Sequence, residues 1–260
     1  MSLGIVTLSA EGLVIARALS TYLPNAEIYA HRSVFAGDKI TAFDRILDLT
    51  EILFQKHDAI VYVAPCGVAV RAIAPHIDHK TRDPAVVVVD VGGRYAVSLL
   101  SGHEGGANRL TTAVANALGA EPVISTTTEA VKDIVVGIGC RRNTAKEALI
   151  EAINDALASN ALELSRVRLL ATADIKQNES GLRAAAETLH IPLLFVPSAQ
   201  IRAFGDAFES SDFVKERVGL PAVAEPCCML VAKRPTLIMG KKKCNGITIA
   251  MARENCLWSA

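Results

Sequence analysis

The stretch SLLSGHEGGAN, residues 98–108, brings a histidine, a glutamate and three glycines together between an apolar run and a helix-like pattern. The imidazole of His103 can transfer protons near neutral pH, and the carboxylate of Glu104 can act as a base or orient the histidine. The alternative interpretation is a glycine-rich turn from a strand to a helix, with an exposed His-Glu pair. The spacing alone supports both interpretations equally.

The backbone of the same stretch is also suited to binding. Glycine permits positive φ and lets a ligand approach the main chain closely. We expect Gly105, Gly106 and Ala107 to present free N–H groups at the start of the following helix, where a carboxylate or a phosphate binds. The side chain of Asn108 can bind a carbonyl or a carboxylate. The predicted ligand contacts in this stretch are Ser101, Gly102, Gly105, Gly106 and Asn108.

A second candidate loop is GIGCRRNT, residues 137–144. A strand that runs into Gly-x-Gly is typical of dinucleotide binding, but Arg142 occupies the third glycine position, so we rank this function low. Arg141 and Arg142 beside a helix N-terminus suit a multiply charged anion better, although a solvated arginine pair at a turn is common. Cys140 could be a nucleophile there, but a small buried side chain that only packs is the favoured interpretation.

Four further charged residues occupy positions where a ligand could bind, and each has a structural alternative. They are Arg71, Lys176, Glu179 and Glu225. Arg71 follows the APCG loop and fits an anionic ligand or an exposed surface equally well. Glu179, close to Lys176, stands just before a helix, where a carboxylate can simply complement the helix dipole. Glu225 falls inside an apolar run, so it needs a bonded partner or a ligand.

The composition excludes several classes of protein. The chain has 260 residues, about half of them apolar, and a formal net charge of zero, which argues against a strongly basic nucleic-acid surface. Its six cysteines show no CxxC spacing, so neither a zinc site nor a disulfide framework is expected. GxSxG, HExxH and Walker motifs are absent from the sequence.

No membrane association or secretion is expected either. The apolar runs are strand-length and fall short of the ~20 residues of a membrane helix. The N-terminus lacks a basic region followed by a long apolar core, so no signal peptide is expected. We therefore expect a cytoplasmic protein with reduced cysteines.

Short β-branched runs alternate with helical patterns along the chain, which predicts an α/β fold. We expect two α/β domains with mostly parallel sheets, residues 1–130 and 131–260, with ligand loops at the carboxyl ends of strands. Residues 41–56 have helical spacing, and residues 210–219 continue the alternation. Gly92-Gly93 and Asn245-Gly246 predict two hairpins.

With these motifs in view, the chain resembles the CbiG family of cobalamin-biosynthesis proteins. VYVAPCGVAVRAIAPHI, DPAVVVVDVGGRYAVSLLSGHEGGANRL and EPVISTTTEA look, in this order, like the N-terminal region of the family. GIGCRRNT, IKQNESGL, VAEPCCML and KCNGITIAMAR look like its C-terminal region, which is similar to the stand-alone protein CobE. The resemblance covers most of the chain from about Ala59 onward, and SGHxGGAN is its most specific piece.

The chain departs from the family pattern in two places. Many members carry a variable segment between the two regions, whereas here TTTEA runs almost directly into DIVVGIGC. Cys66 also stands where many relatives have alanine. The first departure leaves the reaction plausible and bears on how the site closes over its substrate.

The resemblance implies a cobalt-precorrin-5A hydrolase of anaerobic cobalamin synthesis. Such an enzyme opens the δ-lactone formed by the ring A acetate, releases acetaldehyde and yields cobalt-precorrin-5B. Cobalt arrives inside the substrate, so no protein cofactor or metal site is expected. The implied partners are this tetrapyrrole and, as candidates, neighbouring enzymes of the pathway. A non-catalytic corrinoid carrier is the competing function, and a nucleotide-binding α/β enzyme ranks last.

The residues then predict a mechanism. His103, with Glu104, would activate water for attack on the lactone carbonyl, and the N–H groups of Gly105 and Gly106 would stabilise the oxyanion. Arginines and helix N-termini suit the many carboxylates of the substrate. Because the macrocycle is large, we expect both halves of the chain to contribute, with the pocket between them.

Overall fold

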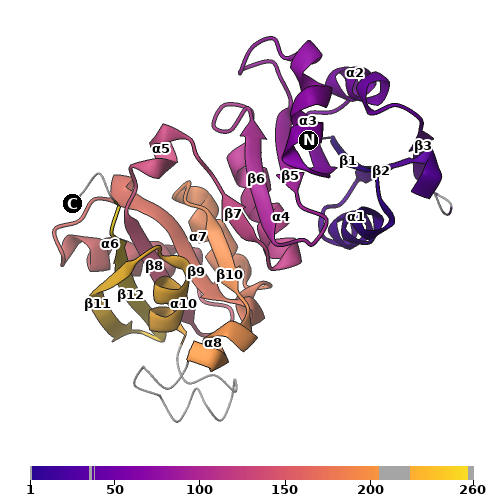
Figure 1. Cartoon of the computed structure of the whole chain (residues 1–260). Helices are drawn as coiled ribbons and strands as arrows, with labels where there is room; N and C mark the ends of the chain where they lie inside the picture. Colours follow the sequence, from indigo (N-terminus) through magenta and orange to yellow (C-terminus); the bar gives the residue numbers. More distant parts are fainter. Residues whose placement is uncertain (1, 35–36, 38, 205–222, 257–260) are drawn as a thin grey trace. The chain divides into compact units, whose positions relative to one another are not determined.

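The computed structural model describes residues 2–34, 37, 39–204 and 223–256 (Figure 1). The chain divides into two compact units, Met1–Thr126 and Thr127–Ala260. The sequence-based boundary between residues 130 and 131 falls directly after the short helix α5 (Thr127–Ala130). The predicted segment 210–219 lies outside the described residues. Within the described ranges, no helix has the length and apolar character that a membrane span requires.

The first unit is built on a seven-stranded sheet in the order β3-β2-β1-β4-β5-β6-β7. Its strands are β1 (Leu3–Thr7), β2 (Ala26–His31), β3 (Ile40–Phe43), β4 (Ala59–Val63), β5 (Ala85–Val89), β6 (Tyr95–Leu100) and β7 (Glu121–Val123). Its helices are α1 (Ala10–Tyr22), α2 (Ile46–Lys56), α3 (Cys66–Ile73) and α4 (Ala107–Leu118), with the 3-10 turns η1 (Arg32–Val34) and η2 (Ala74–His76). The α/β class is as predicted.

Helices cover both faces of this sheet. Helices α1 and α4 pack together on one face, and α2 and α3 pack together on the other. Every residue of β1, β4 and β5 is therefore buried, which explains why these strands are continuous apolar runs. Alternate residues of the same strands point to opposite cores, with Val6 and Ile60 on the α2 side.

The chain reverses direction between β5 and β6, as the Gly92-Gly93 signal predicts. The carboxylate of Asp90 accepts hydrogen bonds from the N–H groups of Arg94 and Tyr95, both at 2.8 Å. Gly93 has φ of +66°, a conformation that residues other than glycine rarely adopt. Strand β6 is consequently antiparallel to β5, whereas the other neighbouring pairs described in this sheet are parallel.

The expected helix over residues 41–56 is wrong at its start. Residues Ile40–Phe43 form β3, which extends the sheet alongside β2, and the helix begins only at Ile46. The side chain of Phe43 is 7% exposed and joins the core beneath α2. Packing of this side chain and pairing of the backbone with β2 outweigh the local helical spacing.

The second unit has a five-stranded sheet in the order β10-β9-β8-β12-β11. Its strands are β8 (Ile134–Cys140), β9 (Val167–Ala173), β10 (Leu193–Val196), β11 (Pro235–Cys244) and β12 (Ile247–Glu254). Besides α5, its described helices are α6 (Lys146–Ala158), α7 (Ser180–Thr188), α8 (Ser198–Phe204) and α10 (Ala224–Val231), with the 3-10 turns η3 (Leu164–Arg166) and η4 (Asp174–Lys176). Strands β8, β9 and β10 are parallel, and the hairpin β11–β12, predicted from Asn245-Gly246, joins β8 antiparallel.

Helix α10 crosses the second sheet in close contact with β8. A Cβ atom on Gly137 would lie 1.9 Å from the carbonyl oxygen of Ala224. The first glycine of the Gly-x-Gly pattern is thus required by the packing of a helix on the sheet. This observation removes the main argument for a dinucleotide site in this loop.

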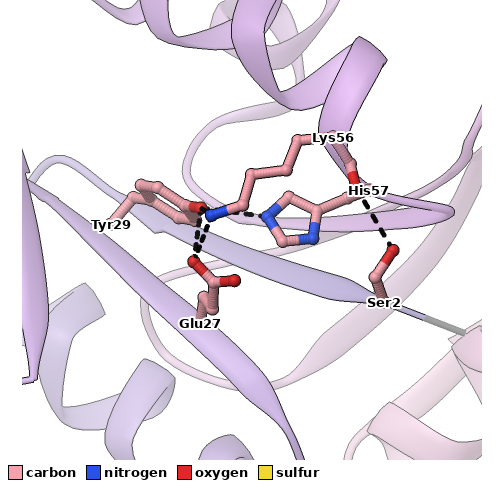
Figure 2. Close-up of polar contacts among 5 residues, drawn as sticks. All are labelled: Ser2, Glu27, Tyr29, Lys56 and His57. Atoms are coloured by element: carbon pink, nitrogen blue, oxygen red, sulfur yellow. Dashed lines mark hydrogen bonds and ion pairs between the residues drawn. The ribbon is translucent and has the colours of Figure 1, made fainter.

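Glu27, Tyr29, Lys56 and His57 form a polar cluster at the amino end of the first sheet, between β2 and the end of α2. Figure 2 shows their side chains pointing toward one another. The Tyr29 hydroxyl donates to Glu27 Oε2 at 2.8 Å and lies 3.0 Å from His57 Nε2. Lys56 Nζ donates to the same carboxylate oxygen at 2.5 Å and to the Tyr29 hydroxyl at 3.0 Å. His57 is 5% exposed, and its Nδ1 has no hydrogen-bond partner within the part of the chain that the structure describes.

This cluster predicts a pH-dependent stability. Burial lowers the pKa of His57 below its ordinary value of 6.5. The folded protein therefore binds this proton less readily than the unfolded chain, and the stability that neutral His57 contributes is lost as the pH falls below about 6.5. We expect the free energy of unfolding of His57→Gln to fall less between pH 7.5 and pH 5.5 than that of the wild type. Urea unfolding at both pH values measures it, and equal pH dependence would contradict the prediction.

Candidate functional site

The loop SGHEGGAN connects β6 to α4, and its place in the sheet follows from the reversal at β5–β6. Leu100 pairs with Val86 near the start of β5. The carboxyl end of β6 therefore lies at the edge of the sheet where β4 and β5 begin. The loop does stand at the end of its own strand, as predicted, but at the edge opposite to the carboxyl ends of β1, β4 and β5.

The loop closes tightly on itself. A Cβ atom on Gly105 would lie 2.5 Å from Cβ of Ser101, and one on Gly102 would lie 2.8 Å from Cγ2 of Thr126. Both glycines are therefore needed for the loop to pack. Ser101 and Gly106 adopt the left-handed backbone conformation, with φ of +55° and +88°. The sequence pattern predicts close approach of a ligand at these glycines. In the structure, the packing and backbone conformation of the loop already require them.

The expected free N–H groups at the start of α4 are partly corrected. The N–H of Ala107 donates to the Ser101 carbonyl at 3.2 Å, so it is not free. The N–H of Asn108 donates to the Gly102 carbonyl at 2.9 Å. Within the described residues, the N–H groups of Gly105 and Gly106 donate to no backbone carbonyl. These two groups remain candidates for binding an oxyanion.

The side chain of Asn108 fastens the loop from inside. It is 8% exposed, its Oδ1 accepts from the Ser98 hydroxyl at 2.8 Å, and its Nδ2 donates to the Thr126 hydroxyl at 3.0 Å. These bonds join β6, α4 and the segment after β7. Both atoms of the amide are thus hydrogen-bonded to protein groups. This structural role accounts for Asn108 without a ligand.

Ser101 differs from Asn108, because its side chain has no hydrogen-bond partner in the described ranges. Its side chain is buried, and its Oγ atom makes no hydrogen bond among the described residues. A Cβ on Gly105 would lie 3.4 Å from that oxygen, so the hydroxyl belongs to the interior of the loop. An unsatisfied buried hydroxyl costs free energy, and it is available to a bound polar group that enters the loop.

His103 and Glu104, the predicted catalytic pair, are both exposed. Glu104 Oε1 lies 2.6 Å from Nζ of Lys80, and the hydrogen bond from Lys80 lowers the pKa of Glu104. The carboxylate is therefore ionised at neutral pH and partnered by a residue that the sequence analysis missed. Lys80 lies 24 positions earlier in a polar turn, and nothing in its local sequence indicates this contact.

Arg71 does not join this loop. It lies on α3, which follows the carboxyl end of β4, and its Nη1 donates to the Gly67 carbonyl at 3.2 Å. The two loops therefore stand at opposite edges of the sheet, separated by the length of a five-residue strand, about 16 Å. Cys66 is exposed at the same edge as Arg71.

The second unit gathers several predicted residues at the carboxyl ends of β8 and β9. Glu179 accepts from the N–H of Asn143 at 2.9 Å and pairs with Nζ of Lys176 at 3.1 Å. The side chains of Lys176 and Glu179 are only 14% and 13% exposed. Burial raises the pKa of Glu179, but the hydrogen bonds from Asn143 and Lys176 outweigh it, so the pKa is below its ordinary value. The charges of Lys176 and Glu179 therefore neutralise each other, and Glu179 holds the backbone at Asn143, next to Arg142.

Arg141 and Arg142 are both exposed at this edge. Arg141 lies over the tip of the β11–β12 hairpin, where its N–H donates to the Gly246 carbonyl at 3.1 Å. A Cβ on Gly246 would lie 2.8 Å from Cδ of Arg141. Arg142 lies close enough to Glu179 to lower the pKa of that carboxyl further. These exposed guanidinium groups can bind an anion from solution.

Two of the remaining candidates have structural explanations. Glu225, 8% exposed at the start of α10, accepts the N–H of Lys241 at 2.7 Å, which accounts for a carboxylate in an apolar run. Burial raises the pKa of the Cys140 thiol, which supports the interpretation that Cys140 packs rather than attacks. Among the described residues, no three His, Cys, Asp or Glu side chains gather in a way that could hold a metal ion.

The close contacts of the loop predict a steric effect on stability. Gly105→Ala places its Cβ against Ser101, and we expect the free energy of unfolding to fall by about 1–3 kcal/mol. Gly67→Ala is the matched control, because its Cβ would meet only an arginine terminus at an ordinary 3.5 Å. Urea unfolding of both variants measures the difference. A Gly105→Ala protein as stable as the wild type would mean that the loop does not close as described.

Two family models match the chain. The model described as "Cobalamin synthesis G N-terminal" matches residues 48–129, and "Cobalamin synthesis G C-terminus" matches residues 134–252. The first match includes the loop SGHEGGAN, and the second includes the arginines that follow β8.

The chain is also similar to named proteins over its length or over one unit. It is 24% identical to a cobalt-precorrin-5A hydrolase of Salmonella typhimurium, and the alignment covers 96% of this chain and 97% of the relative. It is 30% identical to Protein CobE of Sinorhizobium sp, covering 45% of this chain and 76% of the relative. A crystal structure of CobE, described as a protein from the cobalamin biosynthetic pathway, covers 47% of this chain and 90% of its own, at 28% identity and a TM-score of 0.44.

The alignment with the Salmonella typhimurium protein spans 348 positions, whereas this chain has 260 residues. The relative therefore carries residues that have no counterpart here, and their location in the middle of the chain stays a prediction.

Proposed function

Because the chain belongs to the cobalamin synthesis G family, we propose that it is a cobalt-precorrin-5A hydrolase of cobalamin biosynthesis. The observation that carries this proposal is the similarity over nearly the whole chain to relatives of that name. In the proposed reaction, water opens the δ-lactone of the ring A acetate. The carbon extruded from the ring then leaves with its methyl group as acetaldehyde, which gives cobalt-precorrin-5B.

The first step is hydrolysis of the lactone at the loop SGHEGGAN. His103 removes a proton from water as its oxygen attacks the lactone carbonyl, and the ionised Glu104 stabilises the imidazolium that forms. The N–H groups of Gly105 and Gly106 face the developing oxyanion. The single bond between the acyl carbon and the lactone ring oxygen then breaks, and the proton of the new carboxyl group passes to the departing oxygen. The ring A acetate thus becomes a free carboxylate, and the extruded carbon carries a hydroxyl.

The second step breaks a carbon–carbon bond. The hydroxyl gives its proton to solvent water and becomes the carbonyl of acetaldehyde, while the electron pair of the breaking bond passes to the ring carbon. That carbon takes up a proton, and the imidazolium of His103 is a suitable donor because the first step has just charged it. The two steps together consume one water, release one proton to solvent and return the histidine to its starting state.

The second unit contributes charge in this proposal. The substrate carries several carboxylates, and Arg141 and Arg142 are exposed cations held beside a rigid, buried ion pair. A contribution of both units to one pocket stays a prediction. Arg142→Met should raise KM for cobalt-precorrin-5A several-fold, with only a small change in the free energy of unfolding because the side chain is exposed. A KM equal to that of the wild type would contradict it.

A non-catalytic carrier of the same intermediate is the second candidate function. The similarity to CobE favours it, because that alignment extends over only 45% of this chain. A carrier would bind the corrinoid without releasing acetaldehyde, so product analysis separates the two functions.

The test is anaerobic incubation with cobalt-precorrin-5A and trapping of acetaldehyde. We expect the wild type to release it and His103→Asn to release it about 10²–10⁴ times more slowly, because the general base is lost. His190→Asn, which changes an exposed histidine of the second unit, is the control and should match the wild type.

Each other outcome has a definite meaning. Equal rates for wild type and His103→Asn would keep the enzyme and remove His103 from its mechanism. Absence of acetaldehyde from the wild type, together with a bound corrinoid spectrum, would overturn the hydrolase and favour the carrier.

A further inference from the structure

The turn between η2 and β5, residues 78–83, lies beside the loop SGHEGGAN. Strand β5 begins at Ala85, next to the carboxyl end of β6, so the two segments meet at one edge of the sheet. The contact that joins them is the ion pair of Lys80 Nζ with Glu104 Oε1, at 2.6 Å. Lys80 is thus a cation held at the predicted catalytic pair by the topology of the sheet.

The turn itself is braced by its own hydrogen bonds. The carboxylate of Asp83, 8% exposed, accepts the N–H of Asp78 through both oxygens, at 3.0 and 3.3 Å. The N–H groups of Arg82 and Asp83 both donate to the carbonyl of His79, at 2.8 and 2.9 Å. The backbone that carries Lys80 is therefore a fixed support, and only the side chain is free to adjust.

The position of the ion pair leaves Lys80 able to bind a second anion. Its side chain is 66% exposed, whereas that of Glu104 is 37% exposed. An ammonium group has three donors, and Glu104 Oε1 accepts one of them. An ion pair so open to solvent contributes little to stability, so moving the ammonium toward another carboxylate costs little.

We propose that Lys80 binds a carboxylate of the tetrapyrrole substrate at the loop SGHEGGAN while it remains in contact with Glu104. The inference rests on the proposed hydrolase function and names a residue that selects the substrate. A carboxylate of the macrocycle seated on Lys80 places the neighbouring part of the ring next to His103. The contact acts on binding and contributes to the affinity for a polycarboxylate over its esters or amides.

The alternative role is that Lys80 only positions Glu104. The two roles predict different kinetics. Loss of a substrate contact raises KM, whereas loss of a positioning contact lowers kcat at constant KM. The Glu104→Gln background sharpens this distinction, because the positioning role has no carboxylate to act on there.

The experiment compares KM and kcat for cobalt-precorrin-5A among Lys80→Met, Lys80→Arg and the wild type. We expect Lys80→Met to raise KM about three- to tenfold with kcat within about twofold, and Lys80→Arg to restore most of the affinity. Lys80→Met should raise KM by a similar factor in the Glu104→Gln background. The control is Arg32→Met, which removes a paired cation of similar exposure at the opposite edge of the same sheet.

The opposite results are equally definite. An unchanged KM for Lys80→Met, or a fall in kcat alone, would overturn the inference while leaving the hydrolase intact. If the wild type releases no acetaldehyde, the proposed function fails by itself. Lys80 is then tested by titrating the same proteins with cobalt-precorrin-5A and following the corrinoid absorbance, where equal dissociation constants for wild type and Lys80→Met would overturn the inference.

Discussion

The reversal of the chain between β5 and β6 is the constraint on which the candidate site depends. A parallel β6 would end beside the loop that carries Cys66 and Arg71. The turn held by Asp90 instead brings the end of β6 to the start of β5, against the turn at residues 78–83. The composition of the site follows from this single change of direction, because it decides which charged side chains surround His103.

The two candidate regions hold their charges in different ways. The pair Lys80–Glu104 is open to solvent, so its partners can exchange at little cost. The pair Lys176–Glu179 is nearly buried, and Glu179 also holds the backbone at Asn143. Breaking a buried pair is expensive, because it leaves an uncompensated charge behind. The exposed pair Lys80–Glu104 suits residues that act on a substrate. The buried pair Lys176–Glu179 suits a rigid support for the exposed arginines.

The parts of the fold that the sequence predicts depend on local patterns. Continuous apolar runs such as AVVVV indicate strands buried on both faces, and Gly92-Gly93 and Asn245-Gly246 indicate hairpins, because turn geometry is decided within a few residues. The strand Ile40–Phe43 is missed because residues 41–43, which the sequence assigns to a helix, become a strand only through pairing with β2.

The sequence predicts which loop forms the candidate site, but it does not predict the contacts that the side chains of this loop make. The run of glycine, histidine and glutamate makes residues 101–108 a candidate loop, although a glycine-rich turn explains the same spacing equally well. The engagement of Asn108 by Ser98 and Thr126 depends on segments 10 and 18 positions away, and the partner of Glu104 lies 24 positions away. Contacts at such separations are set by the order and direction of the strands, which local spacing does not encode.

The central claim is that chemistry takes place at the loop SGHEGGAN, on the edge of the first sheet where β4 and β5 begin. The most direct measurement is a crystal structure of the His103→Asn protein with cobalt-precorrin-5A bound under anaerobic conditions. The account predicts electron density for the macrocycle with its ring A lactone next to residue 103 and a carboxylate within hydrogen-bonding distance of Lys80. Density for the lactone at the opposite edge of the sheet, beside Arg71, would contradict it.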